Sequence, residues 1–434
     1  MPVLRGENPD MKASTFRTFF AALSAVGALA AASPAAPGAD FLQTNLVSDI
    51  PGLATITDPQ LVNPWGVSHS TTSPFWVSNQ GMTSLYSVTD ATNITKVNIN
   101  APAGFVAIAK TPQGPQGPTG QVSNTNTASF PVNNGGDGGS AHFIFANLNG
   151  TISAWDTGPT EFIQVTTPGA LYTGLAINGP QTRLYAANGA ESGSVDVFDA
   201  SFSPLSLAAD AFVDPSLPAG LVPFNVRDIG GNIYVVYAPA GRANDIVAPY
   251  GAGVVAVFDE NGNFIKGLIT GSRLAAPWGI ALAPASFGRF GSHLLVGNFS
   301  FIHSEINAFD PTNGKFRGTI PIRTRGLNPG GLWTLEFGVG GSNGSPDTLY
   351  FAGSMARRTD CLAPSPRSSR QLGSRREPWG SVAVMRRSGA RSGLASSPFY
   401  GTLVSRFGSL QDHTTRILSE ADLHLLSPII WSRR

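Results

Sequence analysis

The stretch from residue 277 to residue 320 contains four short apolar runs, and these runs decide the fold. They read PWGI at 277–280, LLVGN at 294–298, INAFD at 306–310 and FRGTI at 316–320. Each is short, is rich in residues that favour strands, and is bounded by turn residues. The dipeptide Asn313-Gly314 favours a tight hairpin between the last two runs. The stretch therefore predicts a four-stranded antiparallel unit.

The same unit recurs along the chain. Its opening motif, a turn residue and a variable residue followed usually by glycine and an apolar strand, occurs six times, with third positions 54, 54, 51, 54 and 52 residues apart. So regular a period is typical of repeat architectures. Six units of four strands predict an all-β, six-bladed β-propeller. The third positions are Gly66, Gly120, Gly174, Asn225, Gly279 and Gly331.

An apolar run near the beginning of the chain, Phe41–Val47, belongs to none of the six units. We expect it to supply the outer strand of the sixth blade and to close the ring, since closure leaves only short sheet edges. The predicted propeller spans residues 40–353. Its last blade lacks a third strand within those bounds.

The recurring Pro-x-Gly-apolar, strand-Asn and apolar-x-Val-Phe-Asp motifs resemble those of the NHL and lactonase-like propellers. More narrowly, the chain is similar to an uncharacterised family of exported bacterial proteins, over about Asp40 to Gly353. Lactonase-like propellers hold a divalent metal in the channel with carboxylate and amide oxygens, a ligand set suited to Ca²⁺. No motif requires a cofactor, but the resemblance suggests a calcium set made of Glu336, Asp228, Asn188 and Asn298.

The first 39 residues have the pattern of a signal peptide. Lys12 and Arg17 precede a mostly apolar run, Phe19–Ala32, and small residues follow it. We expect the mature chain to begin between Ser33 and Asp40 and to be secreted or periplasmic. The alternative is a buried amphipathic helix. We expect no membrane span after cleavage, because no second long apolar run follows.

The last 81 residues, from Ser354, differ in composition from the rest. They hold 13 of the 28 basic residues, all arginine, and 5 of the 27 acidic ones, so this tail carries +8 and the body −7. We interpret residues 354–434 as disordered, or as the product of a frame error in a GC-rich gene. A genuine basic tail and a displaced third strand at 380–385 are the alternatives. The overall net charge of +1 gives no sign of a nucleic-acid partner.

Candidate site residues are the departures from the repeat. First strands line the channel of a propeller, so polar residues there can form a pocket. Two tryptophans before equivalent glycines could form a platform for a sugar or quinone-like ring, with packing between blades as the alternative. The predicted ligand-binding residues are Asn225, Arg227, Asp228, Glu336 and His69, with Trp65 and Trp278. The inserts at 113–134 and 238–252 are expected to overhang one face and to contribute to recognition.

No catalytic constellation is visible. HExxH and GxSxG motifs are absent, the histidines are not at equivalent positions, and the one cysteine, Cys361, lies in the tail. The sequence therefore favours a binding or scaffolding module with a protein or carbohydrate ligand. The alternative is a metal-dependent hydrolase of the lactonase-like type, and the sequence leaves open whether the chain is an enzyme.

Overall fold

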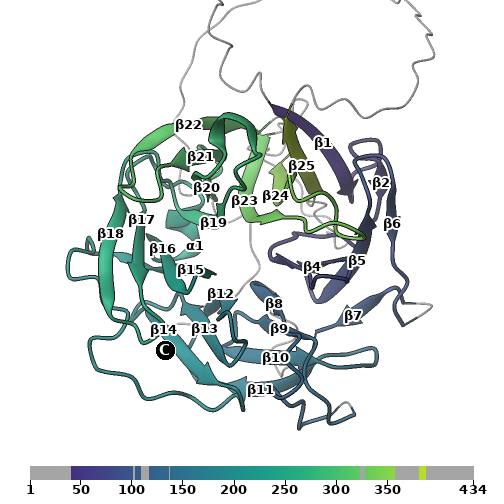
Figure 1. Cartoon of the computed structure of the whole chain (residues 1–434), viewed down its shortest axis with the longest axis horizontal. Coiled ribbons are helices and arrows are strands. Elements are labelled where there is room, and N and C mark those ends of the chain that lie inside the picture. Colours follow the sequence, from purple (N-terminus) through teal and green to yellow (C-terminus); the bar gives the residue numbers. More distant parts are fainter. Residues whose placement is uncertain are drawn as a thin grey trace, which may run out of the picture. The chain divides into compact units, whose positions relative to one another are not determined.

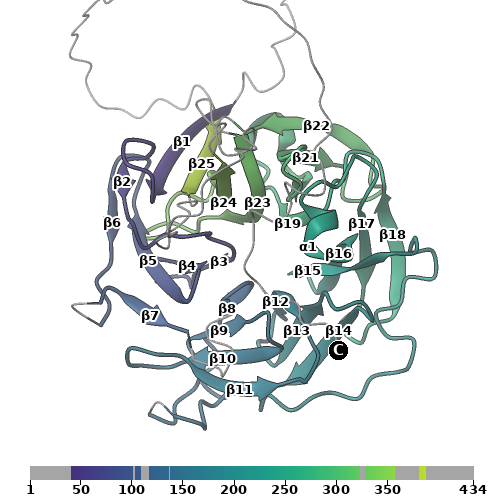
Figure 2. The same ribbon diagram turned by 180° about the vertical axis from the view of Figure 1, so that it is seen from behind.

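Six antiparallel sheets follow one another around a central axis, as the blades of a propeller (Figure 1). The view from behind shows the same ring (Figure 2). The computed structural model describes residues 41–100, 103–108, 117–135, 137–322, 328–356 and 381–387. All of them belong to one unit of the chain, Pro37–Arg434. The six-bladed all-β prediction is confirmed.

In each of the first three blades, the strands lie in chain order from the axis outward. Blade 1 has a fifth strand that pairs with β5, and the described part of blade 3 has three strands. Blade 1 comprises β3 (Val67–Ser68), β4 (Phe75–Asn79), β5 (Met82–Val88), β6 (Ile94–Lys96) and β7 (Phe105–Ala107); blade 2 comprises β8 (Gln121–Ser123), β9 (Phe143–Ala146), β10 (Thr151–Trp155) and β11 (Phe162–Thr166); blade 3 comprises β12 (Tyr172–Ile177), β13 (Arg183–Asn188) and β14 (Ser194–Asp199).

The next two blades have four strands each, and short helices lie in their connections. Blade 4 comprises β15 (Leu221–Ile229), β16 (Asn232–Pro239), β17 (Val254–Phe258) and β18 (Phe264–Thr270), with α1 (Arg242–Asp245); blade 5 comprises β19 (Pro277–Leu282), β20 (Leu294–Asn298), β21 (Glu305–Phe309) and β22 (Phe316–Pro321), with the 3₁₀-helix η1 (Gly288–Phe290). Within the described residues, no helix has the length and apolar character needed to cross a membrane.

Blade 6 joins the two ends of the propeller, as predicted for the N-terminal strand. From the axis outward it contains β23 (Asn328–Phe337), β24 (Leu349–Ala356), β25 (Ser381–Arg387), β1 (Phe41–Ser48) and β2 (Ile56–Thr57). β1 pairs antiparallel with β25 and parallel with β2. The chain therefore closes its ring by placing its first strand beyond its last one.

The expectation that the propeller ends at residue 353 is wrong. β24 continues past Ser354, and β25 pairs with β24 along Leu349–Gly353, where a third strand is required. The reason is that Val382, Ala383, Val384 and Met385 are all buried between two neighbouring strands, which leaves no open edge. The displaced third strand is the alternative that the structure shows. The proposed signal peptide and the rest of the tail lie outside the described residues, and the frame error stays a prediction.

The repeated glycines let the first strands approach one another around the axis. A Cβ added at Gly120 would lie 2.4 Å from the backbone nitrogen of Leu175, and one at Gly279 would lie 2.3 Å from the carbonyl oxygen of Trp333. Contacts so short exclude any side chain, which is why the motif retains glycine. Asn225 is the exception, because its amide donates to the carbonyl oxygen of Trp278 at 2.9 Å and so uses the same inter-strand gap.

The hydrophobic core is divided among the spaces between blades. One buried cluster joins β13 and β14 to β15, β16 and β17, and another joins β16 and β17 to β19 and β20. Each blade thus buries both faces, which is why its inner strands are mostly apolar. This packing fixes the first strands rigidly and so positions whatever their side chains present to the axis.

Candidate functional site

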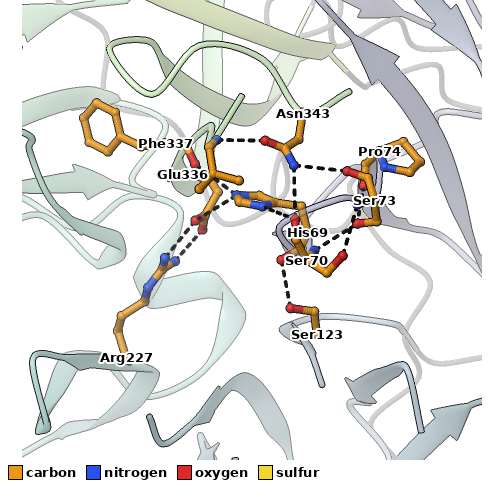
Figure 3. Close-up of polar contacts among 10 residues, drawn as sticks. His69, Ser70, Ser73, Pro74, Ser123, Arg227, Glu336, Phe337 and Asn343 are labelled. Atoms are coloured by element: carbon orange, nitrogen blue, oxygen red, sulfur yellow. Dashed lines mark hydrogen bonds and ion pairs between the residues drawn. The ribbon is translucent and has the colours of Figure 1, made fainter. Parts of the chain in front are cut away.

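An ion pair crosses the axis between two blades that are not neighbours. Arg227, on β15 of blade 4, donates from Nη1 to Oε2 of Glu336 at 2.6 Å and from Nη2 to Oε1 at 2.9 Å. Glu336 lies on β23 of blade 6 (Figure 3). Two parallel N–H···O bonds between a guanidinium and a carboxylate are the strongest geometry open to this pair. The structure thus brings together Arg227 and Glu336, two of the predicted site residues.

His69 brings a third blade to the same point. It follows β3 of blade 1, and its Nε2 lies 3.6 Å from Oε1 of Glu336 and 3.0 Å from the carbonyl oxygen of Phe337. Its Nδ1 lies 3.0 Å from the carbonyl oxygen of Ser70. Carbonyl oxygens only accept, so both contacts are hydrogen bonds only when both ring nitrogens carry a proton, that is, in the imidazolium form. We call Arg227, Glu336 and His69 the axial charge cluster.

The charges in this cluster stabilise one another. Burial alone would raise the pKa of Glu336, but the positive charge of Arg227 and the contact with His69 outweigh it and lower the pKa to about 2. Burial alone would lower the pKa of His69, but Glu336 and the two carbonyl oxygens raise it. When His69 is protonated, two cations face one carboxylate, and the cluster carries a net charge of +1.

Exposure differs among the three side chains. The side chains of His69 and Glu336 are 8% and 12% exposed, whereas that of Arg227 is 36% exposed. A guanidinium has five N–H donors, and Arg227 uses one on each Nη nitrogen for Glu336. Among the described residues, the other donors have no recorded protein acceptor. The part of the cluster that reaches solvent is therefore cationic.

Neighbouring loops hold the histidine in place. Ser123, at the end of β8, donates to the carbonyl oxygen of His69 at 2.8 Å. Asn343, in the loop between β23 and β24, donates to the carbonyl oxygens of Ser70 and Ser73 at 3.1 Å each (Figure 3). Neither Ser123 nor Asn343 was predicted from the sequence, because a lone serine or asparagine in a loop matches no motif. These bonds pre-organise the cluster before any ligand arrives.

Asp228 does not join the cluster, which corrects its predicted place beside Glu336. Its carboxylate accepts from the backbone N–H groups of Gly231 at 2.8 Å and Gly179 at 3.0 Å. Successive side chains of a strand project to opposite sides, so Arg227 and Asp228 cannot both point to the axis from β15. Asn225 is two positions before Arg227 but is 6% exposed, and its amide is used in the contact with β19.

Aromatic side chains pack around Trp333 in another part of the first strands. The ring of Trp65 stacks on that of Trp333 with centroids 3.8 Å apart, and Trp278 meets the same ring edge-on at 5.5 Å. The indole N–H of Trp278 donates to the carbonyl oxygen of Thr173 at 3.0 Å, across from blade 5 to blade 3. Trp278 is 3% exposed, so packing between blades is the role that the structure shows for it. Only Trp65 keeps a partly exposed ring.

The oxygens suggested as calcium ligands are already bonded to protein donors. Glu336 accepts from Arg227, and Asp228 accepts two backbone N–H groups. The amide oxygens of Asn188 and Asn298 accept backbone N–H groups of the loops before β12 and β19. Within the described residues, no group of three His, Cys, Asp or Glu side chains is placed to hold a metal. These four residues therefore do not fit a shared calcium ion.

The connections that follow β8 and β16 leave opposite ends of their blades. Residues 124–134 follow the first strand of blade 2, whereas residues 240–252 follow the second strand of blade 4. Consecutive strands run antiparallel, so their following connections emerge at opposite ends. The insert 113–134 includes β8, so its described residues 117–120 and 124–134 lie at opposite ends of blade 2, and only residues 124–134 lie at the end opposite to residues 240–252. His69 follows a first strand, so the axial charge cluster lies toward the end that carries residues 124–134.

Comparison with known proteins finds related sequences, but none of these relatives has a known activity. No protein-family model matches the sequence. Two uncharacterised proteins of Acanthamoeba polyphaga mimivirus are 29% and 28% identical over 311 and 292 residues, covering 68% and 64% of this chain and 72% and 74% of the relatives. A third from the same virus is 30% identical over 197 residues, 43% of this chain and 36% of the relative. These relatives are viral and do not support the expected bacterial source.

Solved structures with similar folds are distant in sequence. A streptogramin B lyase has a TM-score of 0.43 and 11% identity, with 81% of this chain and 100% of that chain covered. A protein of unknown function from Bacteroides thetaiotaomicron has a TM-score of 0.46 and 9% identity, with 80% of this chain and 77% of that chain covered. What the chain's own strand order shows is a six-bladed β-propeller.

Proposed function

We propose that this chain is a binding protein, and that the axial charge cluster recognises a carboxylate on its ligand. The observation that carries the proposal is that two basic side chains, Arg227 and His69, converge on the single carboxylate of Glu336, while the carboxylate of Asp228 accepts backbone N–H groups instead. The side chain of Arg227 is partly exposed, and its guanidinium keeps Nε–H and the second N–H groups of Nη1 and Nη2, donors that Glu336 does not use and that suit a carboxylate. A bound anion would bring the net charge of the cluster to zero.

The site is built for binding without reorganisation. Three blades hold its three charges, and hydrogen bonds from Ser123 and Asn343 fix the loop of His69. Rigid donors lose little conformational entropy when a ligand binds, which increases affinity for a given set of contacts. A propeller channel is also a common place for ligands, because loops from several blades converge there.

A metal-dependent hydrolase is the weaker proposal. It rested on the resemblance to lactonase-like propellers, and the oxygens suggested as its ligands are bonded to protein donors. Glu336, which would have to act as a ligand or a base, is held ionised by Arg227 with its pKa lowered to about 2. A base with so low a pKa is far from the range that suits proton transfer near neutral pH.

Two further parts of the proposal rest on the sequence: that the chain is exported, and that its ligand is a carbohydrate or a protein. The pattern of residues 1–39 supports secretion or a periplasmic location, and a carbohydrate or protein ligand would suit that setting. Glucuronate is a suitable probe, since it joins a carboxylate to a sugar ring. Glucose supplies the same ring without the charge.

The proposal is tested by thermal unfolding of the full chain with increasing glucuronate or glucose. We expect glucuronate to raise Tm progressively, by about 2–4 °C at concentrations well above Kd, and glucose to have no effect. The double variant Arg227→Gln with Glu336→Gln should lose the response, and it removes both partners of the Arg227–Glu336 ion pair together. Arg317→Gln is the matched control, because it removes an exposed ion pair with Asp310 at the end of blade 5. Equal responses in the double variant and in wild type would refute the proposal.

A further inference from the structure

A second group of polar side chains is buried between blades 1 and 2, apart from the axial charge cluster. This interface is defined by a buried cluster in which β4, β5 and β7 of blade 1 meet β9 of blade 2. The backbone links the two blades here, because the N–H of Glu161 donates to the carbonyl oxygen of Ala107 at 3.0 Å. The buried members of the cluster are Trp76, Leu85, Val106, Phe143 and Phe145.

Strand alternation places several hydroxyl and amide groups on this interface. Residues two apart in a strand project to the same face. Ser78 and Thr83 each lie two positions from a cluster member, on β4 and β5, and Asn147 lies two positions from another, directly after β9. All three are buried, with exposed fractions of 0%, 0% and 2%. Both blades therefore direct polar oxygens into one apolar interface.

Glu161 adds a carboxylate to this group. It immediately precedes β11, and the residue is 1% exposed. Its Oε2 accepts a hydrogen bond from the hydroxyl of Ser153, and Ser153 in turn accepts from the amide of Asn147 at 3.2 Å. Ser153 thus connects the carboxylate of Glu161 with the amide group of Asn147, so that their remaining oxygens lie in one small region.

Four of these buried oxygens have no hydrogen-bond donor among the residues that the structure describes: Ser78 Oγ, Thr83 Oγ1, Asn147 Oδ1 and Glu161 Oε1. Nor does any described lysine, arginine or histidine form an ion pair with Glu161. A buried carboxylate without a cationic partner is costly, and folded proteins rarely leave buried oxygens unsatisfied. Burial raises the pKa of Glu161 to about 8, so the ionised form needs a compensating positive charge near neutral pH.

We infer that the oxygens of Glu161, Asn147, Ser153, Thr83 and Ser78 bind a hard monovalent cation, Na⁺ or K⁺, between blades 1 and 2. The donor set contains oxygen only, which such cations prefer. Glu161 supplies one negative charge and the other groups are neutral, so one positive charge gives a neutral buried site. A divalent cation would leave a net charge of +1 in an apolar interface, which is unfavourable.

Such an ion would join the two blades. It would bind the native state, which places the five side chains at one interface, and not the unfolded chain, in which they are far apart. The ion would therefore stabilise the fold in proportion to the logarithm of its concentration. It would also compete with a proton for Glu161, so its effect should increase with pH. This site is independent of the carboxylate site proposed above.

The test measures Tm of the full chain in NaCl, KCl and choline chloride at equal ionic strength, at about pH 9, where the carboxyl of Glu161 is ionised. We expect Tm to be about 2–5 °C higher in NaCl or KCl than in choline chloride, because choline is too large for the site. Glu161→Gln should abolish the difference. Glu191→Gln, at an exposed loop position, should retain it.

Two outcomes would overturn the inference. Equal Tm values in the three salts, with Glu161→Gln equal to or more stable than wild type, would show that the site holds a neutral carboxyl group. A stabilisation by CaCl₂ alone that depends on Glu161 would show a divalent site. If Glu161→Gln does not fold, broadening of the ²³Na resonance by wild type, reversed by KCl, supplies the same answer. The absence of broadening would also contradict the site.

Discussion

Two groups of side chains, on or next to the first strands, differ in how completely other protein groups pack against them or balance their charge. In the aromatic group, Trp65, Trp278 and Trp333 pack against one another, and the indole N–H of Trp278 has a carbonyl acceptor. In the axial charge cluster, Arg227 and His69 share a single carboxylate, and the guanidinium is partly exposed. The rings of the aromatic group are packed against one another within the protein. The charge cluster retains the capacity to bind an anion, and the following predictions test this difference.

The largest effect should come from removing β25. Its pairing with β24 and β1 closes the ring of blades that holds both groups. A chain truncated after Gly380 loses the strand between β24 and β1. We expect the truncated chain to lose cooperative unfolding and to be digested rapidly by trypsin, because blade 6 is opened. A chain truncated after Arg387 is the control and should unfold with a Tm within about 2 °C of the full chain. Cooperative unfolding of the shorter chain would contradict the role of β25.

Trp333→Ala should destabilise the fold strongly by removing the centre of the aromatic group. Trp333 is 0% exposed, and its ring contacts those of Phe299 and Phe224 as well as the two tryptophans. We expect the free energy of unfolding to fall by about 3–5 kcal/mol, measured by urea denaturation. Glucuronate should still raise the Tm of this variant if it folds. A loss of both stability and response would show that the two groups act as one.

Glu336→Gln should have a smaller effect, because Arg227 is partly exposed. The variant leaves two cations without a carboxylate, and we expect the free energy of unfolding to fall by about 1–3 kcal/mol. Adding Arg227→Gln should recover part of this loss, and a double-mutant cycle measures the coupling. Zero coupling between the two sites would contradict the ion pair across the axis.

The smallest effect should be the pH dependence contributed by His69. Its pKa is raised in the folded chain, so its stabilising charge is fully present below about pH 6.5, the pKa of an unfolded histidine, and is lost as pH rises through the folded pKa. His69→Asn should remove this part of the decline in unfolding free energy. His142→Asn, at an exposed position, is the control. Parallel pH profiles of wild type and His69→Asn would show that the imidazolium is not required.

Much of the fold could be predicted from the sequence, because each blade repeats the same strands at nearly constant spacing. The closing strand was also predictable, since Phe41–Val47 had the pattern of a strand and no unit of its own. β25 was assigned incorrectly because a long Arg/Ser-rich segment precedes it and its apolar part is short. So short an apolar segment can be recognised as a strand only when the strands on both sides of it, β24 and β1, are known.

The site was less predictable, because its chemistry depends on contacts between distant blades. The pairing of Arg227 with Glu336 was foreseen from two departures from the repeat, but the error at Asp228 could have been avoided from strand alternation alone. The raised pKa of His69 could not be foreseen, since it arises from contacts with Glu336 and with the carbonyl oxygens of Ser70 and Phe337 that only the fold creates. The unpaired Glu161 carries no motif and is identified only by its burial.

The most direct test of the carboxylate site observes Arg227 itself. The ¹H–¹⁵N resonance of the Nε–H of Arg227, assigned by its disappearance in Arg227→Lys, would be followed by NMR during titration with glucuronate and, separately, with glucose. The account predicts a saturable shift of this resonance with glucuronate only, while the Nε–H resonance of Arg317 stays unchanged. An Arg227 resonance that does not move with glucuronate, or that moves equally with glucose, would contradict the account.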